Sequence, residues 1–152
     1  MEKIATDISS FENLRKDGYV YVDKTDLLWR LASLKEGRQF FISRPRRFGK
    51  SLMLSTLQCI FEGRRELFKG LKIEQLDYDW EEYPVVHLDM TEAVAENVGQ
   101  LRENLSDIVD GLVELFGLKG VRKVSSPGKY LGNFLKALAS ARGSFVVLVD
   151  EY

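Results

Sequence analysis

The sequence predicts an α/β domain with a parallel sheet, on two observations. Short apolar runs rich in β-branched residues, at 85–89 and 145–149, have the length and composition of core strands. Longer stretches at 52–61, 101–116 and 130–138 repeat apolar residues at helical spacing. Because parallel strands need crossover connections, strands that alternate with helices favour a parallel sheet.

The composition is that of a globular chain with no strong charge bias. Its 152 residues are 45% hydrophobic, and 22 Lys plus Arg against 23 Asp plus Glu leave a net charge of -1. This balance gives no general attraction to nucleic acid or acidic lipid, so any polyanion site must be local. No apolar run approaches the roughly 18 residues of a membrane-spanning helix, and the first ten residues lack a signal-peptide core. We expect a soluble, cytoplasmic protein without membrane contact.

The single cysteine and the single histidine are expected to be structural. Cys59 lies among apolar residues of a predicted helix, which favours an inert core thiol over a reactive one. His87 lies inside a predicted strand with no ligand or nucleophile nearby in sequence, which favours a structural role. With one cysteine, neither an internal disulfide nor a structural zinc site is expected.

Residues 1–37 are expected to form a helical and extended segment that precedes the main domain. Ser9 and Glu12 match a capping box, which predicts a short first helix. An extended stretch should come next, and then a second helix, capped at 25–26 and ending at Gly37.

Residues 38–152 are expected to hold the first part of the main domain and to form one structural unit with the preceding segment. The apolar run at 39–42 predicts a buried strand that enters a tight loop, and a helix begins at Lys50. The run at 145–149 is apolar throughout, so it predicts a strand buried on both faces.

The strongest chemical signal is Gly49-Lys50-Ser51, at the predicted junction of strand and helix. In a phosphate-binding P-loop, backbone N–H groups of the loop and first helical turn point at the phosphates. The lysine reaches the β and γ groups, and the hydroxyl binds Mg²⁺. The tripeptide alone is weak evidence, but the strand and the helix around it are predicted independently. A similar start at 127–130 has tyrosine in place of the hydroxyl, so it predicts only a helix start.

The loop departs from the usual pattern G-x-x-x-x-G-K-[ST]. Arg44 stands where the first glycine is expected, and Pro45 removes one backbone donor, so the loop must take another path. Arg44, Arg46 and Arg47 either supplement the phosphate cradle with bidentate guanidinium contacts or are solvated surface residues, and both interpretations stay open. The expected nucleotide-binding residues are Arg46, Arg47, Phe48, Gly49, Lys50, Ser51 and Leu52.

The second chemical signal is the acidic pair Asp150-Glu151, directly after the predicted strand at 145–149. Ligands of open α/β sheets bind outside the carboxyl ends of the strands, where both signals fall. Asp150 can hold Mg²⁺ together with Ser51, and Glu151 can orient or deprotonate an attacking water. Alone, the pair is more typical of a solubilising turn, but together with the phosphate-loop signal it favours a metal and water site. Asp89 ends the other strand and either lines the same pocket or caps the next turn, with the cap favoured.

Five blocks of sequence then carry a resemblance. They are Tyr21-Val22-Asp23-Lys24-Thr25, residues 43–51, Leu67-Phe68-Lys69-Gly70-Leu71, Tyr83-Pro84-Val85 and Val149-Asp150-Glu151-Tyr152. They resemble, from end to end of the chain, the predicted AAA-ATPase-like family of bacterial P-loop proteins, which also has arginine and proline in place of the first glycine.

The resemblance implies a three-layer α/β/α fold of the P-loop NTPase type, with ATP and Mg²⁺ as ligands. It implies Lys50 as the phosphate lysine with a catalytic role, Ser51 as a metal ligand, and Asp150 with Glu151 as the Walker B pair. More weakly, it implies that residues 23–25 lie near the nucleotide.

Relatives in that family continue for several hundred residues, often into a nuclease-like domain of the PD-(D/E)XK type. We therefore expect this chain to be an N-terminal part, with a fold incomplete at its C-terminus. In similar ATPases a later strand lies between the P-loop strand and the strand at 145–149, so an unpaired strand edge and self-association through it are expected consequences. The leading hypothesis is an ATPase domain that uses hydrolysis of ATP as a conformational switch. The alternatives are a phosphate-, nucleic-acid- or partner-binding module acting through the loop arginines, and an inactive remnant without turnover.

Overall fold

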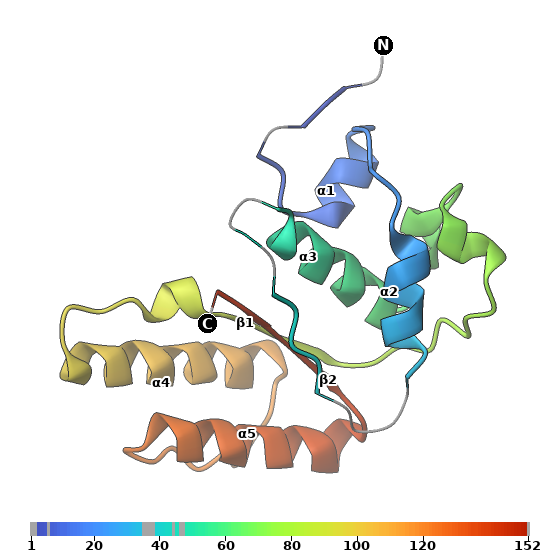
Figure 1. Cartoon of the computed structure of the whole chain (residues 1–152). Helices are drawn as coiled ribbons and strands as arrows, with labels where there is room; N and C mark the ends of the chain where they lie inside the picture. The colour runs from blue at the N-terminus through green and yellow to red at the C-terminus, as the bar shows by residue number, and fades with distance from the viewer. Residues whose placement is uncertain (1–2, 6, 35–38, 44, 46–47, 152) are drawn as a thin grey trace. The chain divides into compact units, whose positions relative to one another are not determined.

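The computed structural model describes residues 3–5, 7–34, 39–43, 45 and 48–151 (Figure 1). The chain divides into two compact units, Met1–Tyr83 and Pro84–Tyr152. This division differs from the expected segments 1–37 and 38–152, which stay a prediction.

Unit 1, Met1–Tyr83, is helical in its described part. Its helices are α1 (Phe11–Lys16), α2 (Thr25–Ala32) and α3 (Lys50–Phe61), followed by the 3₁₀ helices η1 (Arg65–Phe68) and η2 (Lys72–Gln75). α3 packs against both α1 and α2 (Figure 1). Phe11 is fully buried, and its ring stacks on Phe68 with the centroids 4.8 Å apart. Cys59 lies on the buried side of α3, where burial raises the pKa of its thiol to about 12, so the expected inert core thiol is confirmed.

The first helix begins one residue later than predicted. Ser10, and not Ser9, is the N-cap, and its Oγ accepts a hydrogen bond from the backbone N–H of Asn13 at 3.3 Å. Glu12 does not complete a capping box, because its carboxylate binds Arg64 and Lys16. The predicted box is therefore wrong. With the cap at Ser10, the first helical residue is Phe11, which enters the core.

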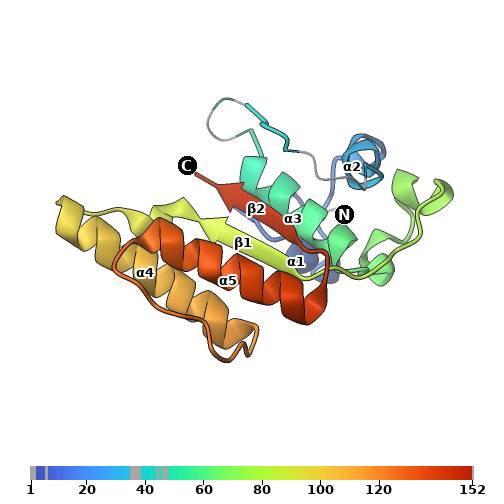
Figure 2. The same ribbon diagram turned by 90° about the horizontal axis from the view of Figure 1, so that it is seen from below.

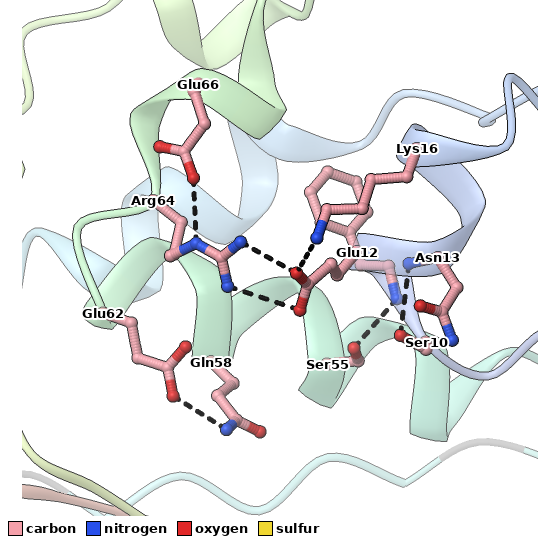
Figure 3. Close-up of polar contacts among 10 residues, drawn as sticks. Ser10, Glu12, Asn13, Lys16, Ser55, Gln58, Glu62, Arg64 and Glu66 are labelled. Carbon is pink, nitrogen blue, oxygen red and sulfur yellow. Dashed lines mark hydrogen bonds and ion pairs between the residues drawn. The ribbon is translucent and has the colours of Figure 1, made fainter.

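An ion cluster joins α1 to the segment after α3 (Figure 3). The Arg64 guanidinium donates to both carboxylate oxygens of Glu12, at 2.9 and 3.3 Å, and to Glu66 at 2.9 Å. The hydrogen bonds from Arg64 and then from Lys16 lower the pKa of Glu12 to about 2. Beside the cluster, the backbone N–H of Phe11 donates to Ser55 Oγ on α3 at 2.9 Å. These contacts fix α1 to α3.

Unit 2, Pro84–Tyr152, contains a two-stranded parallel sheet and two long helices. Its elements are β1 (Val85–Asp89), the 3₁₀ helix η3 (Met90–Ala93), α4 (Val98–Leu115), α5 (Pro127–Arg142) and β2 (Val146–Asp150). Figure 2 shows α4 and α5 side by side along β1. Phe134 and Leu138 of α5 are fully buried in a core that they share with Val86 of β1 and Leu112 of α4. The predicted strands and helices of this unit are confirmed in type and order.

Two predictions about the sheet are wrong. Residues 39–42 form no strand, and within the described residues the sheet consists of β1 and β2 alone. A short apolar run becomes a strand only when a neighbouring strand takes its hydrogen bonds, and the described chain offers the run at 39–42 no such neighbour. β2 is not buried on both faces, since Val147 and Val149 are 37% and 41% exposed. In the parallel register these two valines pair with Val86 and Leu88 of β1. The two β1 residues are buried in the core with α4 and α5, whereas the two valines remain accessible to solvent.

The second predicted helix is shorter than expected. α2 ends at Ala32 with Ser33 as its C-cap, and Leu34 beyond it is exposed. The predicted end at Gly37 lies outside the described residues. The structure is therefore a mixed α/β chain with a small parallel sheet, and it leaves the three-layer P-loop arrangement a prediction.

The Glu12 cluster predicts an acid-sensitive stabilisation. Because the pKa of Glu12 is lowered in the folded chain, its ionised form stabilises the fold fully above about pH 4.5, the ordinary value, and loses this effect as the pH falls toward about 2. Glu12→Gln should therefore lower the melting temperature at pH 7, and the difference from wild type should shrink between about pH 4.5 and 2. Thermal unfolding followed by circular dichroism measures this, with Glu103→Gln, on the exposed part of α4, as the control. A difference that stays constant down to pH 2 would contradict the role given to the cluster.

Candidate functional site

The residues with the strongest chemical signal lie together at the start of α3. Gly49 is the N-cap of this 12-residue helix and has φ 72° and ψ 29°, a left-handed conformation that glycine adopts without strain. A Cβ at Gly49 would meet no atom within 4 Å, so backbone conformation rather than space calls for glycine here. Lys50 and Ser51 come directly after it as the first helical residues, and both are partly exposed.

The start of α3 is also free of competing acceptors among the described residues. No side chain caps the helix, and its first turn contains no acidic residue. Backbone N–H groups at a helix start lack partners inside the helix, and the helix dipole adds positive potential at this end. Together with the Lys50 ammonium, these groups offer several donors and a cation to an anion such as phosphate.

The structure describes only part of the predicted nucleotide-binding loop. Phe48 is 65% exposed, and Leu52 lies half-buried in the first turn of α3, where its carbonyl accepts a hydrogen bond from Thr56 Oγ1. Arg44, Arg46 and Arg47 lie outside the described residues, so whether they contact phosphate stays a prediction.

In unit 2, two strand-ending carboxylates lie side by side at one edge of the sheet. The parallel register pairs Asp89 of β1 with Asp150 of β2. Asp89 is occupied, because its Oδ1 accepts hydrogen bonds from the Thr91 hydroxyl at 2.6 Å and the Thr91 backbone N–H at 2.9 Å. These bonds lower the pKa of Asp89 and make it the N-cap of η3, which confirms the favoured prediction.

Asp150 differs from its neighbour. Its residue is 8% exposed, and no hydrogen bond within the described part of the chain ends on its carboxylate. Glu151, the next residue, is exposed and has φ 55°, an uncommon conformation for a residue with a Cβ. The sheet therefore holds one carboxylate as a cap and leaves the other available to a ligand.

The side chains of Asp23 and Thr25 join two elements of unit 1. Asp23 Oδ1 accepts from the backbone N–H and the hydroxyl of Thr25, and Oδ2 accepts from the backbone N–H of Lys72 at 2.7 Å. Burial opposes the ionisation of Asp23, but these hydrogen bonds outweigh it and lower its pKa. The buried Thr25 hydroxyl accepts in turn from Ile73 N–H at 3.0 Å. These side chains join α2 to η2, and the expected proximity of residues 23–25 to a nucleotide stays a prediction.

Two surface depressions in unit 2 were not expected from the motifs. One, of about 560 Å³, lies beside the end of β1 and has His87, Asp89, Glu92 and Asp107 in its lining. The other, of about 460 Å³, lies against α5 and is lined by Arg122, Lys129 and Lys136 among others. The sequence signal that could have found them is the change from acidic to basic residues along unit 2. The net charge of the whole chain conceals this change.

Two further properties concern the described residues alone. They contain no group of three or more His, Cys, Asp or Glu side chains placed to hold a metal ion. Among them, no helix is both long enough and apolar enough to cross a bilayer.

Comparison with known proteins agrees with the sequence resemblance. The sequence model of a family described as "Predicted AAA-ATPase" matches residues 5–152. An uncharacterized protein encoded in the vnfD 5' region of Azotobacter chroococcum mcd 1 is 32% identical over 154 residues. That alignment covers 99% of this chain but 29% of the relative, so the chain spans about three-tenths of the relative's length. No solved structure matches the chain. On the match over residues 5–152, the chain belongs to the predicted AAA-ATPase family.

Proposed function

We propose that this chain binds ATP with Mg²⁺ through the start of α3, and that the protein it represents hydrolyses the nucleotide. The observation that carries the proposal is the placement of Gly49, Lys50 and Ser51 at the uncapped start of a 12-residue helix. Membership of a family described as a predicted ATPase supports ATP over other phosphate compounds.

The residues at the start of α3 fit a nucleotide triphosphate. The backbone N–H groups of the first turn would bind phosphate oxygens, and the Lys50 ammonium would reach the β and γ groups. Left-handed Gly49 lets the backbone turn into the helix without a side chain between it and the phosphates. The arginines at 44, 46 and 47 are proposed to supplement this cradle from the preceding loop.

Mg²⁺ fits the same residues without a cluster of protein carboxylates. The ion keeps several waters and is usually held by one or two protein groups plus phosphate oxygens. Ser51 would supply a hydroxyl from α3, and Asp150 would supply its carboxylate from the end of β2. Mg²⁺, when bound, neutralises charge on the phosphate oxygens during transfer.

Glu151 is proposed as the residue that orients or deprotonates the attacking water. It comes directly after Asp150, and its side chain is exposed, as a group that meets solvent and substrate must be. Hydrolysis would act as a conformational switch in the protein.

Loss of the Lys50 ammonium should abolish stabilisation by nucleotide. A ligand that binds only the folded state stabilises it by about 2.7 kcal/mol when present at 100 times its Kd. MgATP should therefore raise the melting temperature of the wild-type chain and of Lys129→Ala, whose lysine comes after Gly128 at the start of α5 but has no serine or threonine after it. Lys50→Ala should show no shift. An equal shift in Lys50→Ala and wild type would overturn binding by this loop.

Replacement of Gly49 tests the left-handed turn separately from the charge. Because an added Cβ would meet no neighbour, Gly49→Ala should destabilise the chain only through its backbone conformation, by about 1–2 kcal/mol. Affinity for MgATP should fall with it. Gly111→Ala on α4 is the matched control, and it should stabilise by roughly 0.4–1 kcal/mol with no effect on nucleotide. Urea unfolding and ATP titration measure both effects. A neutral or stabilising Gly49→Ala would show that α3 does not need this turn.

A further inference from the structure

A basic depression on unit 2 is independent of the proposed nucleotide site. It has a volume of about 460 Å³, and its lining is Arg122, Val124, Lys129, Gly132, Asn133 and Lys136. Three cations converge there with one amide, and none of these lining residues is acidic or aromatic. Such a surface attracts anions by charge without offering rings on which bases could stack.

Two of the three cations lie in line along α5. Lys129, Asn133 and Lys136 are four and three residues apart, so they share one face of the helix. With a rise of 1.5 Å per residue, this face extends about 10 Å between the two lysines. The Asn133 side chain donates to the backbone carbonyl of Arg122 at 2.9 Å, which holds the loop that carries the third cation against the helix.

The cations of the depression have no carboxylate partners among the described residues. Neighbouring Lys123 is paired with Asp110, but no ion pair of the described chain includes Arg122, Lys129 or Lys136. Gly132 lies in the lining, and space for a Cβ on it is open. A ligand could therefore approach the helix backbone as well as the side chains.

The three cations belong to a stretch of unit 2 that is basic in sequence. From residue 115 to residue 149 the chain has six Lys or Arg and no Asp or Glu, whereas residues 84–114 have seven Asp or Glu and one Arg. The net charge of -1 for the whole chain therefore hides a basic half and an acidic half of one unit.

We propose that this depression binds the phosphate backbone of nucleic acid, without reading its sequence. Each cation can neutralise one phosphate, so the three together correspond to about three phosphate contacts. With no aromatic ring in the lining, the contacts position a strand and do not distinguish bases.

A second copy of this chain fits the depression less well. The acidic side chains that gather on unit 2 at Asp89, Glu92 and Asp107 themselves line a depression of about 560 Å³. Two hollow surfaces cannot fill each other, whereas a nucleic-acid backbone is convex. The shape of the two surfaces therefore favours nucleic acid.

Fluorescence anisotropy with a labelled 20-nucleotide oligo-dT and a labelled 20-base-pair duplex tests the proposal. Wild-type chain should bind both, and a plot of log K against log salt should have a slope of about -2.7 for the duplex and about -2 for the single strand, as three phosphate contacts require. Lys129→Glu/Lys136→Glu should weaken binding by about tenfold or more and flatten the slope. Lys69→Glu/Arg102→Glu makes the same charge change at exposed positions outside the depression and should bind nearly as wild type.

Several results would overturn the proposal. An equal loss of oligonucleotide affinity in both double variants would mean that binding depends on the net charge of the chain and not on this depression. Competition by saturating MgATP, or loss of oligonucleotide binding in Lys50→Ala, would show that the oligonucleotide binds at the start of α3. Salt-sensitive self-association that the lysine variant removes, without oligonucleotide binding, would identify a second copy as the partner. If circular dichroism shows that Lys129→Glu/Lys136→Glu does not fold, Lys129→Gln/Lys136→Gln replaces it. Unchanged affinity in that variant, or a wild-type salt slope near zero, would then overturn the proposal.

Discussion

The anchoring of α3 by its second half is the constraint on which unit 1 and its candidate site depend. Thr56, Leu57, Cys59 and Ile60 are buried, while Lys50 and Ser51 at the other end are partly exposed. Burial of the last turns and the Phe11 N–H bond to Ser55 hold the helix in place. The first turn can then present its N–H groups at a fixed position, as a rigid anion site requires. The Arg64 cluster and the hydrogen bonds of Asp23 secure the elements that pack around it.

A similar division of roles applies to the two carboxylates at the edge of the sheet. Asp89 and Asp150 are register partners at the ends of two parallel strands. Asp89 caps η3, whereas Asp150 caps no helix of the described chain. Thr91 lies two residues after Asp89 and binds it through its hydroxyl and N–H, whereas no hydrogen bond of the described residues ends on the Asp150 carboxylate. An available carboxylate is what the proposed metal role needs.

Local sequence signals predicted most of the helices and strands. The predictions failed where contacts with residues distant in sequence determine the local structure. Pro127 at the start of α5 and Gly143 at its end mark that helix in sequence, and apolar spacing marks α3 and α4. Local rules favour Ser9 over Ser10 as the cap, because Glu12 lies three residues after Ser9. The observed cap at Ser10 results from Phe11 packing on Phe68 and from Glu12 binding Arg64, which lies 52 residues away. The run at 39–42 looks like a strand, but pairing with a neighbour is a non-local property that hydrophobicity does not contain.

The candidate site was predictable to a similar degree. Gly49, Lys50, Ser51, Asp150 and Glu151 were all singled out from sequence, and the structure places the first three at one helix start and the last two at and just beyond the end of one strand. The availability of Asp150 and the occupation of Asp89 depend on hydrogen bonds that only the folded chain shows. The basic depression escaped prediction because its cations are spread over the α4–α5 loop and α5 and match no phosphate motif.

The proposal that Asp150 helps to hold the Mg²⁺ of bound ATP is tested most directly by the effect of Mg²⁺ on ATP affinity. Calorimetric titration with ATP, in Mg²⁺ and then in chelator, should show that Mg²⁺ strengthens binding to the wild-type chain. In Asp150→Asn this strengthening should be lost while metal-free binding is kept, and Glu151→Gln should retain it, because Glu151 is assigned to water and not to the metal. An Asp150→Asn chain with the full wild-type response to Mg²⁺ would contradict the metal role proposed for Asp150.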